Sequence, residues 1–158
     1  RSLIQGEGLQ TTIRVGLAQP VIGGDNVYLA DDDLLEAHAS VLLWAERLKV
    51  YGIRLSLDCG FMRCLYDDED IEALIRAGVA LRFECSPAVD VGAGLQSWRC
   101  YAFSNQPACN WLDFKDEKAS LDYFRESDAT LLQQCSGCLH LESGWCQGGC
   151  KARALMQA

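Results

Sequence analysis

Nine cysteines in a chain of 158 residues constrain this sequence more than any other feature, because of where they lie. No cysteine occurs in the first 58 residues, whereas four occur in the last 24. Disulfide scaffolds spread their cysteines more evenly, and an odd number of cysteines cannot all pair within one chain. A reducing compartment would also keep the thiols free. The distribution therefore favours metal or iron–sulfur ligation over a disulfide framework.

The densest motif is C-x2-C-x7-C-x3-C, formed by Cys135, Cys138, Cys146 and Cys150. A C-x2-C knuckle can turn two thiolates onto one metal, and the later pair can supply ligands from the other side. The glycines within the motif permit tight turns with positive φ. Tetrahedral zinc and a four-cysteine iron–sulfur cluster are both compatible with this pattern. His140 lies inside the motif and could replace one thiolate.

Three short apolar segments have the character of strands, at residues 11–17, 53–57 and 79–84. Helical periodicity separates them, and the resulting alternation is typical of right-handed βαβ units with parallel strands. Cys59 follows the second strand closely and Cys85 follows the third directly. An isolated cysteine is often only a buried core residue. Two cysteines at strand ends nevertheless indicate that both thiols lie at the carboxyl edge of one parallel sheet.

The two helices between these strands have recognisable ends. Asp31–Asp33 open the first helix and Gly52 ends it, because carboxylates favour the positive N-terminal end of a helix. The pair Asp67-Asp68 opens the second helix, and Gly78 ends it. His38 lies near the apolar face of the first helix and is expected to be structural. The apolar positions of the two helices are Leu34, Leu35, Val41, Leu42, Ala45 and Leu48, and then Ile71, Leu74 and Ile75.

Beyond Cys85 the pattern changes to that of a β-hairpin. Residues 88–91 and 97–103 are expected to form its two strands, joined by a turn at Gly92-Ala93-Gly94. Cys100 would then lie within the second strand.

A polar connection at residues 104–118 follows the hairpin and contains Cys109, which we interpret as a free thiol. Ser120 is expected to cap a helix after this connection. The inner side of that helix comprises Leu121, Phe124, Leu131 and Leu132.

Cys85-x14-Cys100, with glycines between, and the later C-x2-C-x7-C-Gln-Gly-Gly-C together resemble a known pattern. It is the SPASM/twitch auxiliary-cluster region of radical S-adenosylmethionine (SAM) enzymes, and the resemblance covers residues 85–150. Residues 11–84 resemble the later strands of the partial (β/α) barrel that precedes this region. The segment Leu57-Asp58-Cys59-Gly60-Phe61-x2-Cys64 is similar to a motif in some of these enzymes.

The resemblance implies an α/β fold in which half of a partial parallel (β/α) barrel precedes a Cys-rich extension. Residues 1–84 would be the C-terminal part of a radical SAM-type barrel. Residues 85–158 would be a SPASM/twitch-like auxiliary iron–sulfur domain with a β-hairpin and a helix.

The resemblance also implies how the thiols are shared between auxiliary [4Fe-4S] clusters. One cluster would take Cys85, Cys100 and Cys150. The other would take Cys135, Cys138 and Cys146. Cys59 and Cys64 are the candidates for the two open positions, and the sequence does not say which goes where. A simpler, twitch-like alternative is one cluster held by Cys85, Cys100, Cys135 and Cys138.

The chain departs from the pattern of the family in three respects. It has C-x7-C where the family usually has C-x5-C, and it lacks the further cysteine that usually follows the motif. It also contains no C-x3-C-x2-C, the motif whose three thiolates hold the SAM-cleaving cluster. We therefore expect this chain to be inactive alone. S-adenosylmethionine would bind only in the full-length enzyme, where the missing N-terminal radical SAM half is the partner.

Charge and hydropathy narrow the function further. A net charge of −8 and a pI near 4.7 disfavour duplex nucleic acid as a partner. No apolar stretch approaches the roughly 20 residues of a membrane span. No basic-then-apolar signal segment opens the given sequence, so a reducing compartment, the cytoplasm, is expected. The resemblance implies clusters that transfer electrons or anchor a peptide or small-molecule substrate, with peptide modification as one such reaction. The alternative is a non-catalytic zinc-binding or protein-interaction module.

Overall fold

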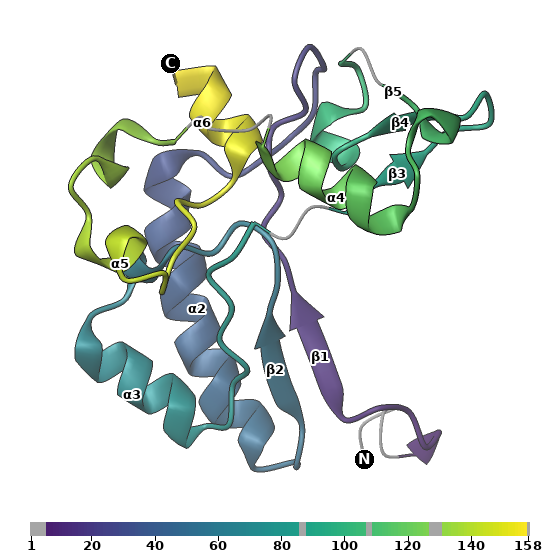
Figure 1. Ribbon diagram of the computed structural model, residues 1–158. Coiled ribbons are helices and arrows are strands. Elements are labelled where there is room, and N and C mark those ends of the chain that lie inside the picture. The colour runs from purple at the N-terminus through teal and green to yellow at the C-terminus, as the bar shows by residue number, and fades with distance from the viewer. Residues whose placement is uncertain (1–5, 86–87, 107–108, 127–130, 158) are drawn as a thin grey trace.

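Two short parallel strands lie side by side in the N-terminal part of the chain (Figure 1). The structure, a computed structural model, describes residues 6–85, 88–106, 109–126 and 131–157 and is mixed α/β. Strand β1 (Thr12–Val15) pairs in parallel with β2 (Arg54–Leu57). Helix α2 (Asp31–Lys49) connects them and packs against β2. The first βαβ unit of the sequence interpretation is therefore present.

The third expected strand is reduced to a single parallel bridge, between Ser56 and Ala80. The amide of Leu57 donates to the carbonyl of Ala80 at 2.9 Å, so this segment does run alongside β2. Residues 81–85 form no ladder with β2. The carbonyl of Phe83 instead accepts from the amide of Gln147, at 2.9 Å. The expected strand is thus shortened, and one of its carbonyls is used by the Cys-rich end of the chain.

Both helices begin at acidic residues, as predicted. In α2 the Asp33 carboxylate accepts from the amide of Ala30. In α3 (Asp68–Arg76) Asp67 accepts from the Asp70 amide at 2.8 Å and completes a capping box. Most of the expected apolar positions are buried or half-buried. The prediction is wrong for Leu35 and Ile75, whose side chains are 62% and 58% exposed. Helices α2 and α3 bury a narrower stripe than the sequence pattern spans.

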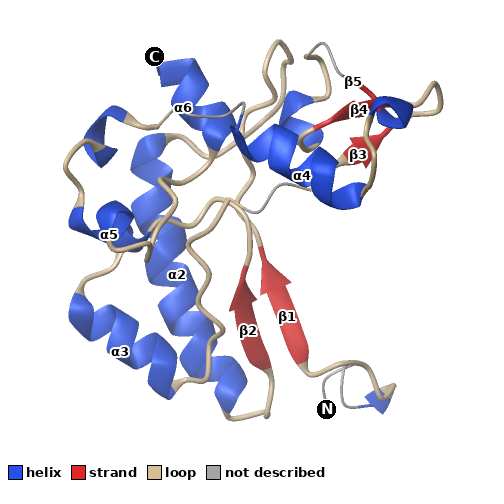
Figure 2. Ribbon diagram, in the orientation of Figure 1, coloured by secondary structure: helices blue, strands red, loops and turns tan. Residues whose placement is uncertain are grey.

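The residues after Cys85 form a small antiparallel sheet in the order β3-β4-β5 (Figure 2). Its strands are β3 (Asp90–Val91), β4 (Gln96–Trp98) and β5 (Cys109–Asn110). The hairpin is therefore confirmed, but its second strand ends at Trp98 and Cys100 lies beyond it. Cys109 lies in a strand and not in a polar loop, because its backbone pairs with Ser97.

Helix α4 (Glu117–Glu126) follows this sheet and begins earlier than predicted. The Asp116 carboxylate accepts from the amide of Ala119 at 2.8 Å and performs the capping role assigned to Ser120. Ser120 lies in the first turn and donates to the Glu117 carbonyl. Leu131 and Leu132 do not extend a helix. The predicted continuation through residues 127–130 lies outside the described residues.

The last part of the chain returns to the start of α2. It contains the short helices α5 (Leu139–Glu142) and α6 (Lys151–Gln157). Arg153 of α6 donates to the Asp31 carboxylate at 2.6 Å and to the carbonyl of Leu29 at 2.5 Å. This contact holds α6 beside the first turn of α2, as Figure 1 shows. Single-turn 3₁₀ helices occur at Arg63–Leu65 (η1), Tyr101–Phe103 (η2), Trp111–Asp113 (η3) and Gln133–Cys135 (η4).

The core continues from the parallel strands into the Cys-rich end. One cluster of buried residues joins α2, β2 and α3 and includes Phe61 and Cys146. A second joins Leu34 and Met62 to Cys135 and to Ala154 of α6. Within the described residues no helix combines the length and the apolar character needed to cross a bilayer. The Cys-rich segments are thus packed against the βαβ unit, and this packing positions their thiols.

Candidate metal centres

Eight of the nine thiols line two cavities, four in each. We call the first the cationic thiol site; its cysteines are Cys59, Cys85, Cys100 and Cys150, and its cavity measures about 490 Å³. We call the second the apolar thiol site; its cysteines are Cys64, Cys135, Cys138 and Cys146, and its cavity measures about 130 Å³. Cys109 lines neither cavity.

The cationic thiol site collects cysteines from four separate segments. Cys59 lies in the turn after β2, and Cys85 ends the segment that bridges to β2. Cys100 follows β4, and Cys150 directly precedes α6. The turn at Cys59 requires Gly60, whose φ is +95°. An added Cβ there would also lie 2.3 Å from the side-chain Nε2 of Gln19. Cys59 and Cys85 thus emerge together near the carboxyl end of the parallel strands, as predicted.

Two thiols of this site interact directly. The Cys59 thiol hydrogen-bonds to the sulfur of Cys150, which raises the pKa of Cys59. The same bond, with the backbone amides of Arg153 and Ala152, lowers the pKa of Cys150 to about 6. Burial raises the pKa of Cys100 to about 11. Of the hydrogen-bonded pair, Cys150 is therefore the thiol that is more readily held as a thiolate.

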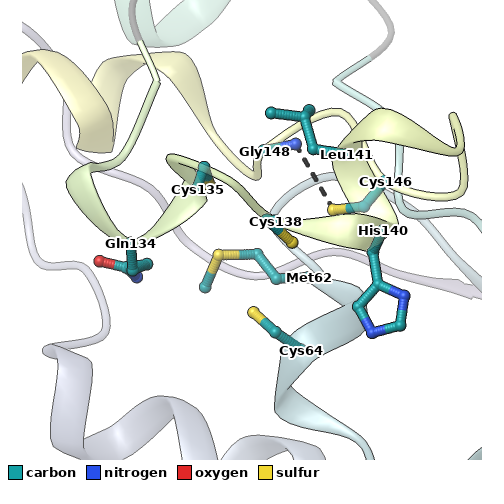
Figure 3. A pocket seen from close by; sticks show the side chains of 9 residues that line it. All are labelled: Met62, Cys64, Gln134, Cys135, Cys138, His140, Leu141, Cys146 and Gly148. Atoms are coloured by element: carbon teal, nitrogen blue, oxygen red, sulfur yellow. Dashed lines mark hydrogen bonds between the residues drawn. The ribbon is translucent and has the colours of Figure 1, made fainter.

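The apolar thiol site is formed mainly by the C-x2-C-x7-C-x3-C motif, with one contribution from elsewhere (Figure 3). Cys64 lies in η1 and reaches the cavity from a segment far from the motif in sequence. Burial raises the pKa of Cys64, and the neighbouring thiols Cys146, Cys135 and Cys138 raise it further. Burial likewise raises the pKa of Cys135. Cys64 is therefore close enough to the three motif cysteines to interact electrostatically with each of them.

The rest of the described lining of the apolar site contains no Asp, Glu, Lys or Arg. It comprises Met62, Gln134, His140, Leu141 and Gly148. The amide of Gly148 donates to the Cys146 sulfur at 3.4 Å, the bond drawn dashed in Figure 3. Gly148 can present its amide in this way because it adopts a positive φ of 81°. His140 remains a fifth possible donor, since it lines the same cavity.

The described thiols do not surround one metal-sized point. No group of three His, Cys, Asp or Glu side chains in the described ranges is already arranged to hold a single ion. The two cavities nevertheless each present four sulfur donors, a set that suits zinc or an iron–sulfur cluster. The donor chemistry therefore fits both candidate cofactors.

The distribution of the thiols can be compared with the sets implied by the resemblance. Cys85, Cys100 and Cys150 share one cavity, and the three other motif cysteines share the second. Cys59 joins the first set and Cys64 the second, which is the choice that the sequence left open. The single-cluster alternative divides its four cysteines between two cavities.

Sequence reasoning missed the basic side chains that surround the cationic site. Arg14, Arg82, Arg99 and Lys151 line its cavity together with one carboxylate, Asp58. Arg99 is only 5% exposed and donates to both the carbonyl and the sulfur of Cys85. Arg99 and Lys151 are sequence neighbours of Cys100 and Cys150, and this adjacency was the available signal.

The two histidines differ in their surroundings. His38 is 2% exposed, hydrogen-bonds to the Leu34 carbonyl and packs against the rings of Phe61 and Tyr66. Burial lowers the pKa of His38. His38 lines neither thiol cavity, which agrees with its predicted structural role.

No protein-family model, no curated protein and no solved structure matches this chain. The thiols and their surroundings are therefore the basis on which a function can be assigned.

Proposed function

We propose that this chain is the C-terminal part of a radical SAM enzyme of the SPASM type and that it holds two auxiliary [4Fe-4S] clusters. The observation that carries the proposal is the sorting of eight thiols into two cavities of four. Residues 1–84 would be the end of a partial (β/α) barrel and residues 85–158 the auxiliary-cluster domain. The parallel pairing of β1 with β2, extended by the Ala80 bridge, supports the barrel assignment.

The number and grouping of the thiols support the proposal. Each cavity offers four thiols, which is the ligand set that one [4Fe-4S] cluster takes. Both sites also draw ligands from either side of residue 85, which ties the two parts of the chain together.

In this function the residues of the chain bind, shield and orient. Bound clusters would supply electron transfer or substrate anchoring. The thiolates hold the clusters, Met62 and Leu141 exclude water from the apolar site, and the Gly148 amide orients the Cys146 sulfur. Reductive cleavage of S-adenosylmethionine belongs to the N-terminal half of the full enzyme, and a peptide or small molecule is its substrate. The cytoplasm, which keeps thiols reduced, is the proposed location.

Metal analysis of the 158-residue chain tests this proposal. After anaerobic reconstitution we expect a brown protein that holds about eight iron and eight labile sulfide per chain, since each site has four thiolate ligands. The Cys109→Ala chain is the matched control and should hold the same amount, because Cys109 lines neither cavity. A colourless protein with stoichiometric zinc and no sulfide would overturn the proposal in favour of a zinc-binding module.

A further inference from the structure

Arg99 is held beside one thiol of the cationic site by two other contacts. Its Nη1 donates to the Phe124 carbonyl of α4 at 2.7 Å, and its Nη2 donates to the carbonyl of Cys85 at 3.3 Å. The same Nη2 lies 3.4 Å from the Cys85 sulfur and donates to it. Because the guanidinium is buried and both of its Nη nitrogens are hydrogen-bonded, its charge stays next to the Cys85 sulfur.

The two thiol sites differ in charge. Four cationic side chains and one carboxylate line the cationic site. The apolar site has no Asp, Glu, Lys or Arg in its described lining, although Lys151 acts electrostatically on its Cys135. The Cys85 sulfur of the first site accepts a hydrogen bond from a charged guanidinium, whereas the Cys146 sulfur of the second accepts one from a neutral backbone amide. Charge-assisted hydrogen bonds are roughly twice as strong as neutral ones.

This difference in charge changes how readily a bound cluster would be reduced. When a thiolate-bound cluster accepts one electron from a reductant, its net charge becomes more negative by one unit. A nearby cation stabilises the reduced form more than the oxidised form, most strongly where burial lowers the dielectric constant. Hydrogen bonds to the sulfurs and net charge are both established determinants of cluster potential. The cationic site should therefore be the easier of the two to reduce.

We propose that the two sites are redox-inequivalent, that the cationic site accepts an electron first, and that Arg99 sets this order through its hydrogen bond to Cys85. The inference rests on the proposed function, since it requires a cluster in each site. It makes Arg99 a positioning and tuning residue, which acts through the Cys85 sulfur.

Redox titration of the reconstituted 158-residue chain, followed by electron paramagnetic resonance, tests the proposal. The parent chain should show two one-electron steps. The Arg99→Gln chain should keep its iron but lose at least tenfold in the reduction equilibrium of the higher step, a fall of 59 mV for one electron. The lower step should not move. Steps that coincide in the parent, or an unchanged higher step in Arg99→Gln, would overturn the proposal.

Arg63→Gln is the matched control. Arg63 is as buried as Arg99, at 4% exposure, but its guanidinium donates to the Tyr66 carbonyl and to Asp68. Its replacement should leave the higher step in place. A shift as large as that of Arg99→Gln would show that any buried arginine has this effect, which contradicts the specific role of Arg99.

A second pair of variants keeps the test decisive if Arg99→Gln does not fold. Cys100→Ala removes a thiol of the cationic site and should abolish the higher step, whereas Cys138→Ala should abolish the lower one. The opposite result would refute the inference. A parent chain that binds no iron refutes the proposed function instead, so the two failures are distinguishable.

Discussion

Pairs of cysteine replacements can test which thiols share a metal centre, and Cys64 is the most informative member. It comes from η1, outside the Cys-rich motif, yet it lines the apolar site with three motif cysteines. Replacing Cys64 by Ala should remove the cluster of that site, or about four of eight iron atoms per chain. The Cys59→Ala chain should lose a similar amount from the other site.

Double replacements give the sharper prediction, because residues that act on one unit are not additive, whereas independent sites are. Cys64→Ala combined with Cys138→Ala should still retain about four iron atoms, since both thiols serve one cluster. Cys64→Ala combined with Cys100→Ala should retain almost none. The two double variants remove the same number of thiols, so a difference between them reports the grouping alone.

Iron and sulfide are measured after anaerobic reconstitution and removal of unbound metal. Cys109→Ala serves as the control and should keep full iron, because Cys109 lines neither cavity. Full iron in the Cys64→Ala chain would refute the grouping. Equal iron loss in the two double variants would do the same, as would a large loss in Cys109→Ala.

Three further predictions concern the fold around the sites. Leu74→Ala should lower the free energy of unfolding by about 2–5 kcal/mol, because Leu74 is fully buried. Ile75→Ala, on the exposed side of the same helix, should lower it by less than about 1 kcal/mol, and denaturant titration measures both values. Burial lowers the pKa of His38, so the unfolded chain takes up this proton first, near pH 6.5, and stability falls as the pH drops from there to the lower folded pKa. The His38→Gln chain should lack this component, and equal acid sensitivity of the two chains would refute it. Removal of metal by chelation should expose residues 85–150 to amide hydrogen exchange while α2 remains comparatively protected. The reason is that metal binding supplies folding free energy to a segment with little core of its own. Uniform loss of protection would contradict this.

Local sequence signals predicted the elements with the strongest capping and periodicity. The acidic starts of α2 and α3, the parallel pairing of β1 with β2 and the hairpin after Cys85 are all present. These features depend on side chains a few residues apart or on the chirality of βαβ units, so they can be read from the chain. The prediction misplaced the end of the hairpin's second strand and the start of α4. The local sequence signal is weak at these ends, so the partner that takes each hydrogen bond decides where the element stops or starts.

The cysteine spacing likewise determined that metal ligation was the leading chemistry, but not which thiols meet. Cys59 and Cys64 are close in sequence and enter different cavities, and the residues between them explain why. Phe61 packs into the core cluster of β2 and α3, whereas Met62 packs into the cluster of Cys135 and α6. The chain crosses from one cluster to the other at this point, so the two thiols are directed apart.

Tertiary structure alone decided the electrostatic character of the two sites. Arg99 reaches the Cys85 sulfur because α4 and β4 place its guanidinium there, and Arg153 fixes α6, and with it Cys150, through contacts with the start of α2. These contacts join residues far apart in the chain. No periodicity or motif encodes them, since a long-range contact depends on how whole elements pack and not on the spacing of neighbouring residues. The sequence by itself therefore determined the kind of side chain that the candidate sites present, and packing determined how these thiols are grouped and the charge around each group.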